Sequence, residues 1–196
     1  MSNPVDDHSL DQIFREGRSQ SAWTDAPVTE TDMRAIYELT RLGATSANCS
    51  PARFLWIVSD EAKARLKPHL SSVNADKVMK APVTVIIGYD LEFAKELPRL
   101  FPRTPTAKDW FAEPAVAQIT AFRNGTLQGG YLILAARALG FDTGPMSGFD
   151  NAGVDKEFFA GSSIKSNFLC SIGKGDPARL PPRDPRLTFE EAGRIL

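Results

Sequence analysis

Apolar residues recur with the period of a helix in some segments and as short unbroken runs in others. Residues 29–42 place apolar side chains at helical spacing behind a capping pair, Thr29 and Asp32, and we predict a helix there. Asp60 precedes a second helical pattern at residues 61–67. Runs typical of buried strands occupy residues 54–58, 83–87, 141–146 and 168–172. The alternation predicts an α+β domain built in layers.

The longest helical pattern covers residues 116–139, and its second half is apolar on nearly every side. A helix without a polar face is buried all round. Gly125, Gly129 and Gly130 each cost about 1 kcal/mol relative to alanine inside a helix, so a gain from close packing should offset them. We expect this helix to form a subunit interface or the wall of a cofactor site. The alternative is a kinked surface helix that tolerates its glycines.

Prolines interrupt two segments of the chain. Residues 98–114 hold large apolar side chains between four prolines, a composition typical of a segment that covers a site or a partner subunit. Four further prolines in residues 177–185 predict an extended C-terminal arm rather than a helix. Residues 173–178 match a G-x-G-x-x-A string, but those prolines exclude the helix that a Rossmann site requires.

Composition limits the partners and the chemistry. The 196 residues, with 23 basic and 24 acidic side chains, suit one domain over residues 1–196 and predict neither a nucleic-acid nor a membrane partner. Cys49 and Cys170 are too far apart for a C-x-x-C motif, and no signal peptide is visible, so we expect a cytoplasmic protein. His8 and His69 are the only histidines, so we expect no metal site.

Three polar clusters lie between the predicted elements. Residues 18–21 place a guanidinium beside hydroxyl and amide groups, which can bind a phosphate. Residues 43–53 form a small polar loop between a helix and a buried strand, where binding groups are often held. Residues 144–150 carry glycines that let backbone N–H groups approach a flat ligand. Taken singly, each cluster could equally be a solvated loop or helix end.

In order and spacing, the three clusters resemble the FMN-dependent nitroreductase family over nearly the whole chain. The strings at residues 45–53, 142–150 and 158–162 are similar to its malonic semialdehyde reductase branch, which serves pyrimidine utilisation. The resemblance implies an α+β, nitroreductase-like layered sandwich with a mixed central sheet and a long buried dimer helix. It also implies a homodimer with two FMN sites at the subunit interface, each built from both chains.

The resemblance assigns side chains to FMN. Arg18, Arg183 and Arg186 would bind its phosphate. Asn74 would reach the edge of the flavin, and Ser147 would lie near N5. The full set is Arg18, Ser19, Ser21, Asn74, Gly144, Pro145, Met146, Ser147, Gly148, Arg183 and Arg186, with Ser46, Asn48 and Ser50 from the facing subunit.

With a flavin as the hydride carrier, no catalytic side chain is required. The resemblance implies ping-pong hydride transfer from NAD(P)H through FMN to a small carbonyl such as malonic semialdehyde (3-oxopropanoate), giving 3-hydroxypropanoate. Arg53, Arg103 and Arg123 are candidates for binding a substrate carboxylate, and each could equally form a surface ion pair. Many family members have a basic residue at the position of Ser21 and Gln-Pro-Trp at the positions of residues 50–52. These two departures leave open how the electrostatics of the flavin N1–O2 edge are tuned.

Two other functions stay open. A broad-specificity nitro or quinone reductase would share the fold and take a nitro substrate. A non-catalytic flavin-binding module would hold FMN that NAD(P)H does not reduce. The choice between NADH and NADPH is also open, because no acidic ribose ligand or 2′-phosphate arginine can be located in the sequence.

Overall fold

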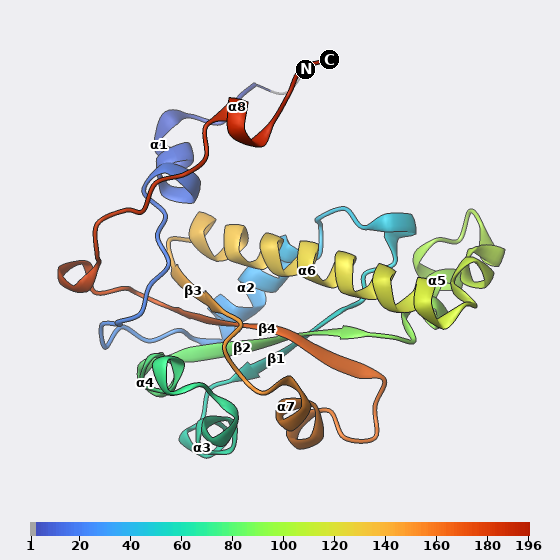
Figure 1. Cartoon of the computed structure of the whole chain (residues 1–196), viewed down its shortest axis with the longest axis horizontal. Helices are drawn as coiled ribbons and strands as arrows, with labels where there is room; N and C mark the ends of the chain where they lie inside the picture. The colour runs from blue at the N-terminus through green and yellow to red at the C-terminus, as the bar shows by residue number, and fades with distance from the viewer. Residues whose placement is uncertain (1–2) are drawn as a thin grey trace.

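The computed structural model describes residues 3–196 and builds them around one four-stranded sheet (Figure 1). The strands are β1 (Ala52–Ile57), β2 (Val83–Asp90), β3 (Asp142–Met146) and β4 (Ile164–Gly173), in the order β1-β2-β4-β3. Every neighbouring pair is antiparallel. The inner strands β2 and β4 contain the longest buried stretches, because both of their faces are covered.

The layered α+β arrangement is confirmed, but the sheet is antiparallel rather than mixed. The one parallel pairing among the described residues is an isolated bridge between Ser19 and Thr143 of β3. Trp23, four residues later, already bridges Gly175, beyond the end of β4. The N-terminal segment therefore crosses the end of the sheet instead of running along β3, and no parallel strand forms.

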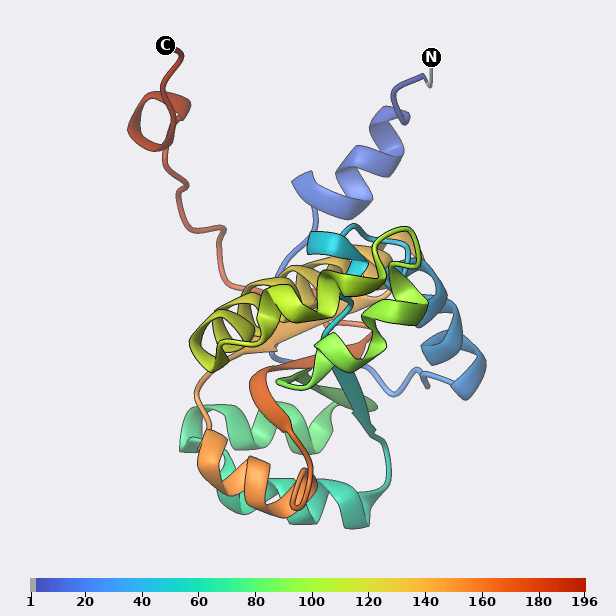
Figure 2. The same cartoon turned by 90° about the vertical axis from the view of Figure 1, so that its right-hand side faces the viewer.

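Helices cover both faces of the sheet (Figures 1 and 2). On one face lie α2 (Glu30–Thr40) and α6 (Pro114–Ala138), and on the other α3 (Asp60–Leu66), α4 (Ser72–Lys80) and α7 (Asn151–Phe158). Alternate side chains of β2 enter the two cores. Val85 and Ile87 pack on the α2 and α6 side, whereas Ile86 packs among residues of α3, α4 and α7.

The helices and strands that the hydrophobic pattern predicts are all present within a few residues of their expected ends. Thr29 and Asp32 form the capping box of α2. α3 is capped by Ser59 rather than Asp60, because the Ser59 side chain accepts a hydrogen bond from Ala62 N at 3.1 Å. The hydrophobic pattern did not predict the short helices α4 and α7.

The remaining elements are also short. They are α1 (Asp7–Leu10), a π-helical turn η1 (Asp11–Arg15), the 3-10 turns η2 (Ser46–Asn48), η3 (Lys67–His69), η4 (Phe93–Glu96), η5 (Pro105–Phe111) and η6 (Pro177–Arg179), and the helices α5 (Leu97–Leu100) and α8 (Phe189–Ala192). α8 interrupts the C-terminal arm, so the prediction of an arm without helix is wrong there. Thr188 and Glu191 form a capping box that starts this turn.

Two glycines of α6 are required by the sheet beneath the helix. A Cβ at Gly129 would lie 2.5 Å from Cζ of Phe168, and one at Gly125 would lie 2.9 Å from Cβ of Tyr89. Close helix-to-sheet packing therefore accounts for both glycines. Gly130 has no neighbour within 4 Å of such a Cβ.

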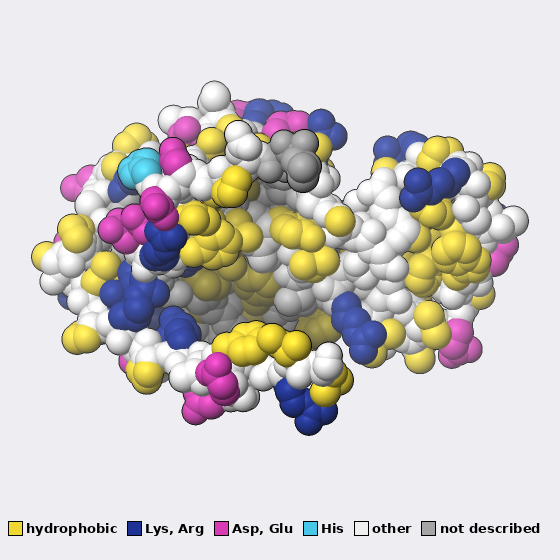
Figure 3. All heavy atoms as spheres, turned by 90° about the horizontal axis from the view of Figure 1, so that it is seen from above, with side chains coloured by type: hydrophobic (Ala, Val, Ile, Leu, Met, Phe, Trp, Pro, Cys, Tyr) yellow, Lys and Arg dark blue, Asp and Glu magenta, His cyan; other side chains and the backbone are white. Residues whose placement is uncertain are grey.

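Several apolar side chains of α6 are exposed, and we call three of them the α6 stripe. Ile119 and Phe122 are each 47% exposed and Leu127 is 44% exposed. Viewed from above, hydrophobic side chains surround a hollow in the middle of the molecule (Figure 3). α6 is thus not buried all round within one chain. Over residues 3–196, no helix combines the length and the apolar character needed to cross a bilayer.

Candidate functional site

Four arginines from distant parts of the chain meet at a cavity of about 360 Å³, which we call the arginine cavity. They are Arg18 after η1, Arg137 in the last turn of α6, and Arg183 and Arg186 on the C-terminal arm. The arm passes the N-terminal segment near the end of α6 (Figure 1). Ser19 lines the cavity as well. The structure thus brings together four of the residues that the resemblance assigns to FMN, namely Arg18, Ser19, Arg183 and Arg186.

No ion pair neutralises these four arginines within residues 3–196. Their N–H groups donate to backbone carbonyls instead. Arg18 Nη2 donates to Pro181 O at 2.7 Å, and Arg183 Nη2 donates to Arg15 O at 2.5 Å. Both bonds tie the N-terminal segment to the arm. Since Asp184 is the only acidic residue among those lining the cavity, the site carries a net positive charge and suits an anion.

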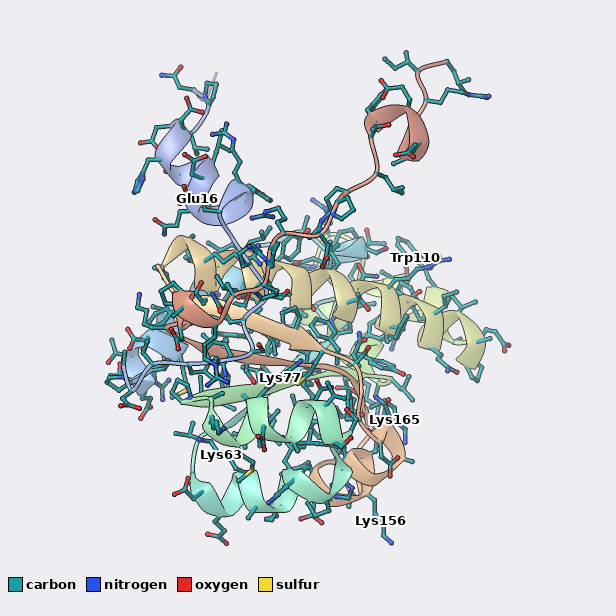
Figure 4. The ribbon with its side chains drawn as sticks, turned by 60° about the vertical axis from the view of Figure 1, so that its left-hand side comes forward. Glu16, Lys63, Lys77, Trp110, Lys156 and Lys165 are labelled. Atoms are coloured by element: carbon teal, nitrogen blue, oxygen red, sulfur yellow. The ribbon has the colours of Figure 1, made fainter. Side chains whose placement is uncertain are left out.

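The cations of the arginine cavity are all guanidinium groups. Lys63, Lys77 and Lys156 lie in the layer of α3, α4 and α7, on the other side of the sheet (Figure 4). Guanidinium groups can bind the oxygens of a phosphate in pairs, which an ammonium cannot do. In the described part of the chain, no group of three or more His, Cys, Asp or Glu residues is placed to hold a metal ion.

Arg137 is the one member of this cluster that the sequence did not indicate. Its Nη1 donates to Ile13 O at 3.2 Å, and its Nε is buried without a hydrogen-bond partner. Burial is the main cause that lowers the pKa of its guanidinium. The negative charge of Asp142 raises this pKa, whereas the positive charge of Arg183 lowers it. The signal in the sequence was a lone charged residue in the apolar half of the longest helix.

Gly144 lies inside β3, and the space left by its missing side chain is filled by the N-terminal segment. A Cβ at Gly144 would clash with Gln20 O, and Gln20 N donates to Thr143 O at 2.9 Å. The close approach that we expected toward a flat ligand is therefore made by Gln20. Pro145 and Met146 complete the strand. Pro145 is tolerated because β3 is an edge strand, where a missing N–H breaks no ladder.

Asn74 and Gly148 meet just beyond the end of β3. Asn74 Nδ2 donates to Gly148 O at 3.0 Å, and a Cβ at Gly148 would lie 2.8 Å from the same nitrogen. Asn74 is buried, so its amide fixes the backbone that follows β3. Ser147 and Gly148 remain exposed there, and Ser21 is exposed in the N-terminal segment. These hydroxyl and backbone groups are open to a ligand.

The loop at residues 45–50 is strained. Ala47, Asn48 and Ser50 have φ angles of 48°, 51° and 38°, in the left-handed region. Residues other than glycine rarely adopt this backbone, and the surrounding structure must hold it in place. Such strain is concentrated at functional sites in proteins.

Two amide side chains of α6 hold this loop near its two ends. Asn124 Oδ1 accepts a hydrogen bond from Ser46 N, and Gln128 Oε1 accepts one from Ala52 N, both at 2.9 Å. The two amides are four residues apart and so lie on the same side of the helix. The sequence analysis missed both, although their spacing on an otherwise apolar helix was the available signal.

The strained loop lies at a second cavity. Asn48 and Ser50 line a space of about 520 Å³ together with Arg53 and Gln128. This space shares no lining residue with the arginine cavity. One chain therefore places Asn48 and Ser50 at a different cavity from the arginines.

The three candidates for binding a substrate carboxylate lie apart. Arg53 Nη2 pairs with Asp90 Oδ2 at 2.7 Å, and Ser163 Oγ donates to Asp90 Oδ1 at 2.6 Å. Burial raises the pKa of Asp90, but the Ser163 hydroxyl and the Arg53 guanidinium outweigh it and lower the pKa. Arg53 thus forms an ion pair. Arg103 lies over an aromatic ring at 4.4 Å, and Arg123 is exposed on α6.

Comparison with known proteins places the chain in a family. The sequence pattern of the Nitroreductase family matches residues 14–174. A protein of Stenotrophomonas maltophilia (strain K279a) is 58% identical over 196 residues, 100% of both chains. A protein of Caulobacter sp. (strain K31) is 56% identical over 192 residues, 98% of both chains. Both are provisionally named NADH dehydrogenase/NAD(P)H nitroreductase.

The fold also matches a solved structure. A provisionally named nitroreductase of Exiguobacterium sibiricum 255-15, in complex with FMN, superposes with a TM-score of 0.87 at 22% identity and 100% coverage of both chains. FMN in that complex and NAD(P)H in the names of the relatives agree with the cofactor and reductant that we predicted. The chain belongs to the nitroreductase family.

Proposed function

We propose that this chain is an FMN-dependent NAD(P)H oxidoreductase that acts in the cytoplasm as a homodimer of single-domain subunits. The observation that carries the proposal is the convergence on one cavity of four arginines that form no ion pair within residues 3–196. A phosphate monoester is the part of FMN that such a site suits, because its dianion accepts several charge-assisted hydrogen bonds. Family membership supports the same cofactor.

The residues of the chain would bind and orient the cofactor. FMN, when bound, supplies hydride transfer. Arg18, Arg183 and Arg186 would hold its phosphate from two segments, which the hydrogen bonds of Arg18 and Arg183 tie together. Asn74 keeps the backbone after β3 in position, so that Ser147 and its neighbours present fixed groups to the ring. In this arrangement, no side chain would form a covalent bond to the substrate or the cofactor.

A second copy of the chain would complete the site. The α6 stripe is apolar and exposed in one chain, which makes it a candidate for packing against its copy. The strained loop with Ser46, Asn48 and Ser50 lies at a cavity separate from the arginines, so it would serve the other subunit's FMN.

For the substrate, we propose malonic semialdehyde, reduced to 3-hydroxypropanoate. The support is the similarity of residues 45–53, 142–150 and 158–162 to that branch of the family. Arg103 and Arg123 are free of ion pairs within residues 3–196 and are the better candidates for its carboxylate, because Arg53 is paired with Asp90. A broad nitro or quinone reductase is the second candidate, favoured by the names of the two relatives.

A visible spectrum and two assays test these proposals. Purified protein, with FMN added, should show a flavin spectrum that NADH or NADPH bleaches under anaerobic conditions. Turnover of 3-oxopropanoate would support the semialdehyde reductase, and turnover of a nitroaromatic alone would support the nitroreductase. Bound FMN that neither nucleotide bleaches would identify a non-catalytic flavin-binding module. Failure to take up FMN would refute all three functions.

A further inference from the structure

Arg137 lies between two cavities at the end of α6. Its side chain lines the arginine cavity and also a smaller space of about 220 Å³ lined by Gln12, Glu16 and Asp142. Gln12 Nε2 donates to Arg137 O at 2.7 Å, which fixes the last turn of the helix against the N-terminal segment. The guanidinium is therefore carried by a rigid element, unlike those on the arm.

Residue 17 leaves space for this guanidinium. A Cβ at Gly17 would lie 2.9 Å from Arg137 Nη1 and 3.0 Å from its Cζ. The N-terminal segment thus passes directly over the arginine, and Nη1 donates to Ile13 O at 3.2 Å. This hydrogen bond fixes the position of the guanidinium, but the neutral carbonyl of Ile13 does not compensate the positive charge.

No anionic group of the described chain pairs with Arg137. Glu16 and Asp142 line the smaller cavity but make no ion pair with it. Asp142 Oδ2 instead accepts a hydrogen bond from Gly175 N at 2.9 Å. Burial raises the pKa of the nearby Cys170 to about 12, so that thiol is neutral at physiological pH. A half-buried cation without a counter-ion is costly unless a ligand supplies the charge.

We propose that Arg137 is the fourth phosphate-binding arginine of the FMN site, holding the dianion from α6 while the other three hold it from the chain ends. This inference rests on the proposed function. Its support is the shared cavity, the absence of an ion pair and the buried Nε that lacks a partner. An anion between Arg137 and Arg183 would also relieve the repulsion of two like charges.

The test compares FMN with riboflavin, which lacks the phosphate. Dissociation constants of both ligands are measured by flavin fluorescence for the full chain and for Arg137→Met. We expect FMN affinity to fall at least about tenfold, because charge-assisted hydrogen bonds are lost, while riboflavin affinity stays the same. Arg137→Lys, which restores the charge, should recover part of the loss. Arg34→Met, on an exposed residue of α2, should change neither affinity.

A purely structural role would give a different result. Equal losses for FMN and riboflavin, or no loss for either, would overturn the assignment. If Arg137→Met does not fold, Arg137→Gln takes its place, since a glutamine amide can still donate to Ile13 O. Should the unmodified chain bind neither ligand, the proposed function fails as well. If it binds FMN and the variants show no FMN-specific loss, only the role of Arg137 fails.

Discussion

Asn124 on α6 accepts a hydrogen bond from the backbone N–H of Ser46 at 2.9 Å, across 78 positions of sequence. The same amide donates to Thr120 O at 2.9 Å, so its orientation within the helix is fixed. A buried side chain of the central helix therefore determines where a strained surface loop begins. This relationship makes the loop a part of the rigid core rather than a mobile connection.

Replacing Asn124 by alanine should loosen that loop. Ser46 N loses its acceptor, and we expect the free energy of unfolding to fall by about 1–3 kcal/mol. Urea denaturation followed by circular dichroism measures the change. Asn167→Ala is the matched control, because Asn167 Nδ2 makes an exposed hydrogen bond to Thr126 Oγ1 and should cost much less. An equal effect of the two variants would contradict the role of Asn124.

The double variant Arg18→Ala, Arg186→Ala tests the phosphate site from both ends of the chain. If both arginines bind the phosphate, FMN affinity should drop by about 1.5–3 kcal/mol for each charged hydrogen bond that is lost. Fluorescence titration with FMN gives the value. Arg34→Ala, Arg65→Ala, on exposed residues of α2 and α3, provides a control with the same change of charge. Unchanged affinity in the first variant would remove both residues from the site.

Gly129 and Gly130 form a matched pair on α6. Alanine at Gly129 would clash with Phe168 and should destabilise the fold by about 1–3 kcal/mol through overpacking. Alanine at Gly130 meets open space within one chain, and helix propensity should raise the stability of the subunit by up to about 1 kcal/mol. Thermal melts of both variants under identical conditions distinguish them. Similar melting temperatures would contradict the packing described for Gly129.

The α6 stripe makes the subunit interface testable. Leu127→Glu places a charge in the proposed interface and should shift the protein to a monomer in sedimentation velocity. FMN binding should weaken in parallel, because each site would draw residues from both chains. Val73→Glu, a 73% exposed residue on α4, serves as the control for a charge on the opposite layer. A dimer that survives Leu127→Glu would argue against the stripe as the interface.

The Arg53–Asp90 pair predicts a dependence of stability on pH. The pKa of Asp90 is lowered in the folded chain, so the ionised carboxylate stabilises the fold above its ordinary value near 3.8. That contribution is lost as the pH falls through the lowered value. The difference in stability between the unmodified chain and Asp90→Asn should therefore be largest near neutral pH and shrink below about pH 4. Denaturation curves of the two proteins across this range measure the difference, and a difference that stays constant below about pH 4 would contradict the role of the pair.

The sequence predicted what local patterns determine. Thr29 and Asp32 mark the start of α2, and short apolar runs mark strands β1 and β2, because these signals involve neighbouring residues. It could not predict that Gln20 occupies the space left by Gly144, since this contact depends on how the N-terminal segment crosses the sheet. Asn124 and Arg137 were missed for a related reason. Each forms a hydrogen bond to a segment that is far away in sequence. The helical pattern of the sequence does not show which face of the helix contacts that segment.

The hydrogen bonds from Arg18 to Pro181 and from Arg183 to Arg15 have a consequence for biosynthesis. Arg18 is synthesised before all four strands, whereas Arg183 and Arg186 follow β4 along the described chain. The sheet and both helical layers can form before the arginine cavity exists. A nascent chain that lacks the arm has only two of the four arginines, so we expect it to bind a phosphorylated ligand weakly. Synthesis of the arm completes the cavity after the rest of the domain can already have folded.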